Sequence, residues 1–506
     1  MKRIEPIRLL KTDFLLRTME ITIKKEAESK SEAIVLGLFW EDRPLFANKN
    51  LTLEVEEATK KKIFAKEKFG QSYLTSAEGK RVLIIALGKR KELDANKVRR
   101  IFGKVVKIMK ANRLTSFFTN VTELVRPLFS AQELGRYVSE GLILGNYNFI
   151  KYLSKEKQEE NKPIANVYLQ WKGDEKALLD GVRMGRAVAE ATNYVKDLVN
   201  EPANVVTPIY LEQEAKKLSG VKVRVLNKEE LKKEGLHAFL GVNLGSHLPP
   251  KLIFIEYKGA GNAPWTAIVG KGITFDSGGL NLKPTGYMED MKCDMSGAGA
   301  VLGTIKVLSQ LGIKKNVLGV IPATENAIGG MAQKPGDIVR AYNGKTIEIG
   351  NTDAEGRLIL ADALSYTEAK YNPEIMIDLA TLTGACVVAL GYEASGIMGK
   401  DESLLADLEK AGRKSYDRVW RFPFYEEYQD HMDGLISDVN NISFRNKGRD
   451  AGAIMGGVFL SKFVDKAKWA HIDIAGPAFL VEDSDYQQKF GSGCGVRLLS
   501  YYFIEW

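Results

Sequence analysis

Residues 265–299 read WTAIVGKGITFDSGGLNLKPTGYMEDMKCDMSGAG, and this stretch decides the class of fold. It opens with apolar and β-branched residues that predict a buried strand at 265–270. A glycine-rich loop with several charged residues follows, and helical spacing begins at Gly297. The order of strand, loop and helix predicts an α/β unit, in which ligand sites gather at the carboxyl ends of the strands.

The same alternation continues on both sides of this stretch. Alternating strands and helices predict a largely parallel sheet that is covered by helices on both faces. We expect this arrangement to form a C-terminal domain over residues 201–506. The further strands are predicted at 251–257, 316–323, 375–383 and 469–476, and the helices at 297–311, 357–370 and 453–464.

Residues 1–170 are predicted to form a second, smaller α/β domain. Long helical spacing between Ala177 and Val199 predicts a connecting helix within residues 171–200. The predicted fold class is therefore α/β with two domains. In the N-terminal domain, strands are predicted at 21–25, 33–40, 81–88 and 166–171, and a helix at 94–110.

The composition is that of an ordinary globular protein. The 506 residues are 45% hydrophobic and 27% charged, which excludes wholesale disorder, collagen and coiled coil. Three scattered cysteines do not form a disulfide framework, which indicates a reducing compartment. Glu5, Lys11 and Asp13 interrupt the N-terminus before a signal-peptide core can form, and no apolar run is long enough to span a bilayer. We expect a soluble, cytoplasmic protein with no membrane partner.

Four carboxylates in two segments suggest metal chemistry. Asp276 and Asp294 lie in the glycine-rich stretch, while Asp353 and Glu355 lie in NTDAEGRLILADAL, residues 351–364. Converging carboxylates repel one another and their pKa values rise unless a cation is present. Two divalent cations would neutralise four carboxylates, and Mn, Mg and Zn all accept oxygen ligands. No histidines pair at metal-ligand spacing, so the residues themselves predict a carboxylate-rich metal-hydrolase site.

Two lysines and an arginine accompany these carboxylates. Lys283 can direct its ammonium at a developing oxyanion. Lys271 can bind metal as a neutral amine, because a nearby cation lowers its pKa. Arg357 offers planar donors to a small oxyanion. Each residue also has an ordinary explanation when taken alone: a solvated lysine, a turn, or a carboxylate that caps the following helix.

The exact strings carry the interpretation further. NTDAEGRLILADAL, and VGKGITFDSGGLNLKP followed by MKCDMSGAGA, closely resemble the signatures of the leucyl aminopeptidase family, the cytosol aminopeptidases. The resemblance extends more loosely from about residue 180 to the end, through NEPANVVTP, DLATLTGA and KWAHIDIAG. Cys293, Ser296 and Gly299 depart from the residues more usual in that family, but none is a matching charged position.

The resemblance implies a role for each matching residue. Two divalent metal ions per subunit (Mn or Zn, alternatively Mg) would be bound, and the implied ligands are Lys271, Asp276, Asp294, Asp353 and Glu355, with Asp276 and Glu355 bridging. The implied catalytic side chains are Lys283 and Arg357, the latter holding a bicarbonate ion as general base. The implied lining of the pocket for the first side chain of the substrate is Met291, Thr381 and Gly384, and Lys283 is implied to bind the substrate as well.

For the whole chain the resemblance implies a metallo-exopeptidase. It would hydrolyse the N-terminal residue from peptides, preferring leucine and other apolar residues, by attack of a hydroxide that bridges the metals. The N-terminal domain would resemble a macro domain, and the catalytic domain would have a mixed central sheet between helices. Family members resemble one another in forming homohexamers, which is the oligomer we expect.

Two other classes of function remain open to test. Basic clusters at 60–62, 89–91 and 99–100 suggest nucleic-acid binding, but a net charge of +8 is modest and no recognition motif is readable. A two-metal phosphoesterase would be expected to use histidine ligands, and none lie near the motifs. The spacing of Gly297, Gly299 and Gly303 is not that of a dinucleotide fingerprint.

Overall fold

The computed structural model describes residues 19–27, 30–44, 46–445 and 450–506. The N-terminal segment in which no signal peptide is predicted lies outside these residues. The chain divides into two compact units. The first comprises the described residues up to Arg186 together with Asp485–Gln487, and the second comprises Ala187–Ser484 and Gln488–Trp506. No helix among the described residues has the length and apolar character needed to cross a membrane.

The first unit is built on one sheet with the strand order β1-β6-β5-β2-β4-β3. Neighbouring strands are parallel except for the edge strand β3, which is antiparallel to β4. The strands are β1 (Glu20–Lys24), β2 (Ala33–Phe39), β3 (Ser72–Ala77), β4 (Lys80–Gly88), β5 (Ser116–Thr119) and β6 (Asn166–Gln170). The helices are α1 (Lys49–Lys60), α2 (Ala95–Ala111), α3 (Val121–Val125), α4 (Ala131–Asn146), α5 (Lys155–Glu160) and the first part of α6 (Glu175–Asn200).

The second unit contains a larger mixed sheet with the strand order β16-β15-β18-β14-β9-β11-β8-β7, and β10 pairs with β11 outside this path. Its strands are β7 (Lys222–Leu226), β8 (Lys251–Lys258), β9 (Trp265–Gly270), β10 (Gly272–Asp276), β11 (Asn316–Asn326), β14 (Ile375–Ala380), β15 (Ser395–Gly399), β16 (Val419–Arg421) and β18 (Lys468–Asp473). Smaller sheets are formed by β12 (Ile338–Arg340), β13 (Thr346–Glu348) and β17 (Val439–Asn440), and by β19 (Phe479–Leu480) and β20 (Phe490–Gly491).

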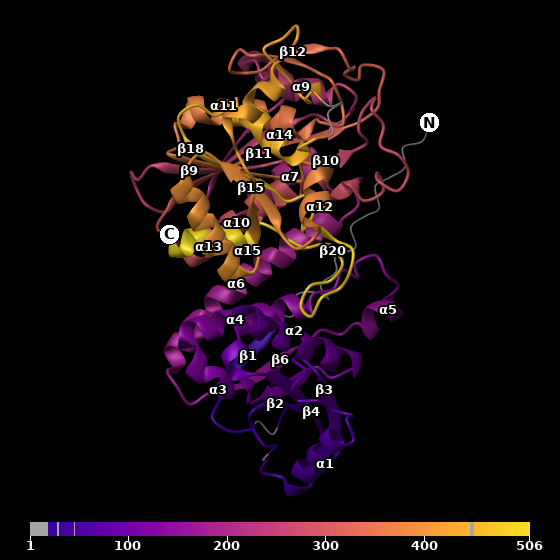
Figure 1. Cartoon of the computed structure of the whole chain (residues 1–506), viewed down its shortest axis with the longest axis vertical. Coiled ribbons are helices and arrows are strands. Elements are labelled where there is room, and N and C mark those ends of the chain that lie inside the picture. The colour runs from indigo at the N-terminus through magenta and orange to yellow at the C-terminus, as the bar shows by residue number, and fades with distance from the viewer. Residues whose placement is uncertain (1–18, 28–29, 45, 446–449) are drawn as a thin grey trace. The chain divides into compact units, whose positions relative to one another are not determined.

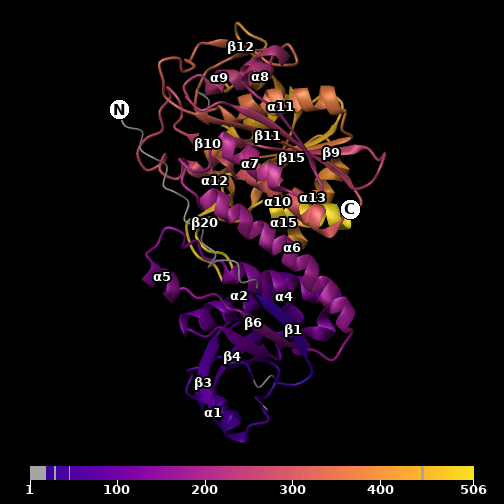
Figure 2. The same ribbon diagram turned by 180° about the vertical axis from the view of Figure 1, so that it is seen from behind.

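Helices cover both faces of this sheet. The helices are α7 (Pro208–Lys217), α8 (Lys228–Glu234), α9 (His237–Asn243), α10 (Ser296–Leu311), α11 (Gly356–Tyr371), α12 (Gly384–Leu390), α13 (Glu402–Ser415), α14 (Gly452–Ser461) and α15 (Val496–Glu505). Both views place α9, α11 and α14 on one side of the sheet and α10, α13 and α15 on the other (Figures 1 and 2). Aliphatic residues of α11 and α14 pack with those of the sheet in one continuous core.

The predicted fold class is confirmed, and the mixed character of the sheet has a simple origin. The central strands β11, β9, β14 and β18 are mutually parallel, whereas β8 and β15 run antiparallel on either side of them. Strand β10 was not predicted, because its sequence GITFD lies inside the glycine-rich stretch that reads as a loop. Its pairing with β11 has a register irregularity between Ile273 and Asp276, beyond which Asp276 still pairs with Asn326.

Two predicted strands end earlier than their sequences suggest. The apolar run 375–383 is a strand only as far as Ala380, because the polar groups of the next three residues bond to other parts of the unit. The run 469–476 likewise ends as a strand at Asp473, whose carboxylate accepts a hydrogen bond from the N–H of Ala475 and begins a turn. Both strand ends lie next to the candidate site.

Candidate metal centre

The residues of the candidate site follow the ends of neighbouring strands and precede two helices. Lys271 comes directly after β9, and Asp276 is the last residue of β10. Asp294 lies in a short 3₁₀ helix, Met291–Met295, that leads into α10, and Glu355 immediately precedes α11. Because β9, β11 and β10 are parallel, their carboxyl ends meet at one edge of the sheet.

Glycines allow the helices to approach this edge closely. A Cβ atom at Gly297 would lie 2.2 Å from the carbonyl oxygen of Leu379, and one at Gly270 would lie 2.2 Å from the carbonyl oxygen of Gly297. A Cβ atom at Gly356 would lie 2.4 Å from Cε of Lys271. These glycines therefore pack backbone against backbone and leave space for the lysine side chain. Close packing, rather than dinucleotide binding, accounts for the glycine at 297.

Two lysines bring the four carboxylates together. Lys271 Nζ lies 2.9 Å from Asp294 Oδ1 and 2.8 Å from Glu355 Oε1. Lys283 Nζ lies 2.9 Å from Asp276 Oδ2 and 2.5 Å from an oxygen of the fourth carboxylate, Asp353. One carboxylate oxygen each of Asp276, Asp353 and Glu355 lie within 4.8 Å of one another. The structure thus gathers side chains from both sequence motifs into one cluster.

Burial and mutual repulsion shift the pKa values of these groups. Burial, with the nearby charge of Glu355, raises the pKa of Asp276 to about 7, and burial holds the pKa of Asp294 well above its usual range. Burial also raises the pKa of Asp353. Glu355 differs: burial would raise its pKa, but the charges of Lys271 and Lys283 outweigh burial and lower it. The cluster is therefore short of positive charge.

The residues present fit a divalent cation. Four carboxylates face two ammonium groups, so full ionisation of the carboxylates would leave two negative charges without a counter-charge. Asp294 Oδ2 is buried and has no hydrogen-bond partner among the described residues, which is costly unless a cation or water binds it. Oxygen donors with one amine suit Mn, Mg or Zn. Such an ion would favour loss of the proton that Lys271 carries here.

Arg357 lies in the first turn of α11, buried beside the cluster. Its Nη1 donates to the carbonyl oxygen of Asn441 at 2.7 Å, and its guanidinium carbon is 6.0 Å from the ring centroid of Phe459. Its Nε has no hydrogen-bond partner among the described residues. Burial lowers the pKa of Arg357 to about 10, against the opposing charges of Glu355 and Asp473. The arginine thus remains charged at neutral pH with a donor available to an anion.

Two residues that sequence reasoning missed tie the motifs together. Asn326 Nδ2 donates to Asp276 Oδ1 at 2.8 Å and to the carbonyl oxygen of Thr352 at 3.0 Å. Thr352 Oγ1 donates to the carbonyl oxygen of Gly278 at 2.8 Å and accepts from the N–H of Asn281 at 2.8 Å. Asn326 is the last residue of β11, one of the parallel strands. Its position near the carboxyl end of a predicted strand could have identified it as a site residue.

The three residues expected to line the substrate pocket lie in different surroundings. Thr381 contacts the cluster directly, because its hydroxyl donates to Asp294 Oδ1 at 2.7 Å and its carbonyl oxygen accepts from Lys271 Nζ at 2.9 Å. Gly384, the first residue of α12, is exposed, and a Cβ atom there would meet nothing within 4 Å. Met291 is half-buried at the start of the 3₁₀ helix that carries Asp294.

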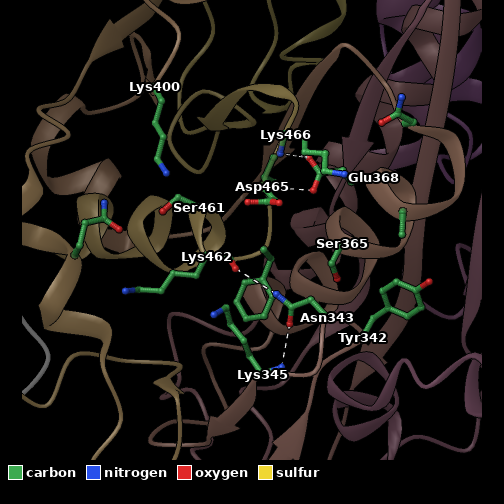
Figure 3. A pocket seen from close by; sticks show the side chains of 15 residues that line it. Tyr342, Asn343, Lys345, Ser365, Glu368, Lys400, Ser461, Lys462, Asp465 and Lys466 are labelled. Atoms are coloured by element: carbon green, nitrogen blue, oxygen red, sulfur yellow. Dashed lines mark hydrogen bonds between the residues drawn. The ribbon is translucent and has the colours of Figure 1, made fainter.

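A separate cavity of about 660 Å³ lies at the opposite end of α11, near its last turn (Figure 3). Glu368 accepts hydrogen bonds there from the backbone N–H groups of residues 465–467. Lys345, Lys400 and Lys462 are among its lining side chains. None of the residues predicted for the catalytic site is among the described residues that line this cavity.

Comparisons with known proteins identify the family of this chain. The profile of the "Cytosol aminopeptidase family, catalytic domain" matches residues 193–500, and the profile of that family's N-terminal domain matches residues 41–156. A probable cytosol aminopeptidase of Geotalea uraniireducens (strain Rf4) is 42% identical over 427 residues, which cover 83% of this chain and 85% of the relative. Another of Geobacter sp. (strain M21) is 39% identical over 508 residues, covering 96% and 99%.

Solved structures give the same result. A mutant of tomato leucine aminopeptidase is similar with a TM-score of 0.83 and 30% identity, over 96% of each chain. The bottromycin maturation enzyme BotP in complex with Mn is similar with a TM-score of 0.82 and 30% identity, over 94% of this chain and 99% of that one. The resemblance seen in the sequence motifs is therefore confirmed, and this chain belongs to the cytosol aminopeptidase family and is an aminopeptidase.

Proposed function

We propose that this chain is a two-metal aminopeptidase that removes leucine and other apolar residues from the N-termini of peptides. The observation that carries the proposal is the convergence of Asp276, Asp353 and Glu355, joined to Asp294 through Lys271. One metal ion would be held by Lys271, Asp276, Asp294 and Glu355, and the other by Asp276, Asp353 and Glu355. When bound, such ions polarise a carbonyl oxygen and lower the pKa of the attacking water.

Lys283 is suited to stabilise negative charge on the substrate. Burial would lower its pKa, but the charges of Asp276 and its neighbours outweigh burial and raise it, so the ammonium stays protonated. We propose that this ammonium donates hydrogen bonds to the oxyanion that forms when the scissile carbonyl is attacked. Its half-buried position, with two carboxylates in contact, limits the directions in which it can point.

Arg357 is suited to hold a small anion, and bicarbonate is the one we propose. The buried guanidinium has one N–H without a partner among the described residues, and an anion would satisfy it. A bicarbonate ion there would supply a proton acceptor and donor within reach of the substrate. Arg357 itself would orient the anion, because its own pKa of about 10 keeps it charged.

The specificity for an apolar first residue is proposed to come from Met291, Thr381 and Gly384. Gly384 leaves open space where any other residue would project a side chain. Met291 offers an apolar and adaptable surface. Thr381 fixes the distance between this pocket and the metal ligand Asp294, to which it donates a hydrogen bond. The side chain of the first residue would then lie beside the metal ions.

We also propose that the chain works in the cytoplasm as a homohexamer and divides functionally into an N-terminal domain (1–170), a connecting helix (171–200) and a catalytic domain (201–506). Large apolar side chains are exposed at Tyr425, Leu435 and Ile436, and exposed apolar surface of this kind commonly marks a protein interface. Sizing with light scattering tests the hexamer, because a monomer of 56.2 kDa is readily distinguished from six copies.

One experiment tests the proposed function. The purified protein is analysed for metal and assayed on leucine p-nitroanilide before chelation, after chelation and after Mn²⁺ is returned. We expect activity that is lost with the metal and restored by Mn²⁺, with little hydrolysis of p-nitrophenyl phosphate. Activity that survives complete metal removal, or faster hydrolysis of the phosphate ester, would contradict the proposal.

A further inference from the structure

Asp473 is a buried carboxylate that the proposed chemistry does not use. It is the last residue of β18, and its side chain is fully buried. The hydrogen bonds it accepts come from uncharged groups: the N–H of Leu382 at 3.1 Å, the N–H of Ala475 at 3.1 Å and the hydroxyl of Thr383 at 2.6 Å. The buried Arg357 is near enough for the charge of Asp473 to raise its pKa, and the three hydrogen bonds hold the carboxylate in one place.

Two of the three bonds reach across to a segment after a different strand. The bond from Ala475 spans two residues and is ordinary turn geometry. The bonds from Leu382 and Thr383 instead hold the segment that follows β14, which we call the 381–383 segment (Thr381, Leu382 and Thr383). Thr383 is also the N-cap of α12, since its Oγ1 accepts from the N–H of Cys386 at 3.1 Å.

The other end of the same segment holds the candidate metal ligands. The hydroxyl of Thr381 donates to Asp294 Oδ1 at 2.7 Å, and its carbonyl oxygen accepts from Lys271 Nζ at 2.9 Å. A displacement of Leu382 and Thr383 would therefore be transmitted over one peptide unit to Thr381. Removing a residue that hydrogen-bonds to a metal ligand and orients it typically lowers metal affinity or activity.

We propose that Asp473 is a positioning residue: by anchoring the 381–383 segment it fixes Lys271 and Asp294 for metal binding and sets the wall of the pocket that ends at Gly384. The inference rests on the proposed function, because it takes Lys271 and Asp294 as metal ligands. The inference adds Asp473, from β18, to the residues that act at the site, although Asp473 contacts none of the proposed metal ligands. Its effect passes through hydrogen bonds that all lie within the second unit.

A neighbouring carboxylate provides a matched control. Asp378, on β14, is also fully buried on the same sheet, and it accepts from Trp469 Nε1 at 2.8 Å and contacts His471 Nδ1 at 2.5 Å. Those bonds remain between adjacent strands and do not reach the 381–383 segment. The next residue, Leu379, accepts from the N–H of Lys271 at 3.0 Å, but this part of β14 is held by parallel pairing with β9 and β18 on both sides. Asp378→Asn should therefore cost stability in the way any buried polar change does, while this backbone and the 381–383 segment stay in place.

The experiment compares Asp473→Asn and Thr383→Val with Asp378→Asn in the full chain. Asparagine retains an acceptor for the two N–H groups but loses the acceptor for the Thr383 hydroxyl. Valine removes the same hydrogen bond from the other side, together with the N-cap bond that Thr383 accepts from Cys386, whereas Asp473→Asn leaves that N-cap bond intact. Calorimetric titration of the metal-free proteins with Mn²⁺ gives the dissociation constant. We expect it to rise about tenfold in both test variants, the low end of the effect of such outer groups, and to be unchanged in Asp378→Asn.

A second readout separates the pocket from the metal. At saturating Mn²⁺ the test variants should show a higher KM for leucine p-nitroanilide with a smaller change in kcat, and a lower preference for leucine over alanine p-nitroanilide. A general loss of folding would lower the melting temperature of all three variants without this pattern.

The outcomes distinguish a failure of this inference from a failure of the proposed function on which it rests. If wild type binds Mn²⁺ and depends on it, but both test variants keep the wild-type dissociation constant and leucine preference, the role of Asp473 is wrong and the proposed function stands. If wild type neither binds nor needs a divalent metal, the proposed function itself fails and the inference with it. Should Asp473→Asn not fold, Thr383→Val decides, because it leaves the carboxylate and its two backbone donors in place.

Discussion

The ammonium of Lys271 lies 2.8 Å from Oε1 of Glu355, and both side chains are 3% exposed. Each group stabilises the charged form of the other. Burial would lower the pKa of Lys271, but the charges of Asp294 and Glu355 outweigh burial and raise it. If Lys271 is a metal ligand, as we propose, a cation would have to displace the proton that the cluster holds on it, which would couple metal binding to pH.

Metal affinity should rise with pH. Asp276 has its pKa raised to about 7 and Lys271 is protonated in the metal-free site, so protons compete with the cation for both groups. The dissociation constant for Mn²⁺ should fall as pH increases from about 6 to about 8. Titration calorimetry in two buffers of different ionisation enthalpy measures both the affinity and the protons released. An affinity that is constant over this range, with no proton release, would contradict the prediction.

Replacement of Gly356 should disable the centre. In Gly356→Ala the new Cβ would lie 2.4 Å from Cε and 2.6 Å from Nζ of Lys271, so the lysine must move away from Glu355. Overpacking of this kind costs about 1–3 kcal/mol of unfolding free energy. We expect loss of Mn²⁺ binding and a lower melting temperature. Gly330→Ala is the control, because a Cβ there meets nothing within 4 Å, and its melting temperature and metal binding should match wild type.

Lys283→Ala should reduce turnover without removing the metal. Loss of one donor to an oxyanion typically lowers kcat by about 10²–10³-fold, while the proposed metal ligands remain in place. Steady-state kinetics on leucine p-nitroanilide and metal analysis of the same sample test this together. Lys345→Ala, which removes a lysine from the separate cavity, should leave both values unchanged. Undiminished turnover in Lys283→Ala would show that the assigned role is wrong.

Arg357→Met should abolish a response to bicarbonate. Wild-type activity in buffer freed of carbon dioxide should rise when bicarbonate is added, because the buried guanidinium offers a donor and a positive charge to the anion. The methionine variant has neither and should show low activity that bicarbonate does not change. Equal stimulation of the two proteins would remove Arg357 from the proposed anion site.

The buried pair of His471 and Asp378 should make stability depend on pH. Burial would lower the pKa of His471, but the charge and hydrogen bond of Asp378 outweigh it, so the folded pKa lies above the ordinary 6.5. A raised pKa means that the stabilisation is fully present below pH 6.5 and is lost as pH rises through the folded value.

Urea unfolding of wild type and His471→Gln measures this contribution. The difference in their free energies of unfolding should be larger near pH 6 than near pH 9. His237→Gln provides the control, because it makes the same substitution at an exposed position. A difference between wild type and His471→Gln that is the same at both pH values would contradict the prediction.

Local sequence determined the central strands of the larger sheet and the helices α10, α11 and α14 that pack against it. The strands at 265–270 and 316–323 and the helices beginning near 297 and 357 follow from apolar periodicity, which reports burial on one or two faces of an element. The strands that were missed include β3 and β10, because SYLTSA has little apolar character and GITFD lies among glycines, and also β5, β7, β15 and β16. The segments of β3 and β10 form strands because they pair with β4 and β11, which lie elsewhere in the sequence.

The sequence by itself determined which side chains carry charge into the centre, since the acids and lysines of two motifs are enough to identify a carboxylate-rich site and a family. Only the tertiary structure decided that Asn326 orients Asp276 and that Asp473 anchors the 381–383 segment. The physical reason is that hydrogen bonds between the ends of parallel strands join residues far apart in the chain, and no local pattern of residues encodes which carboxylate will meet which amide.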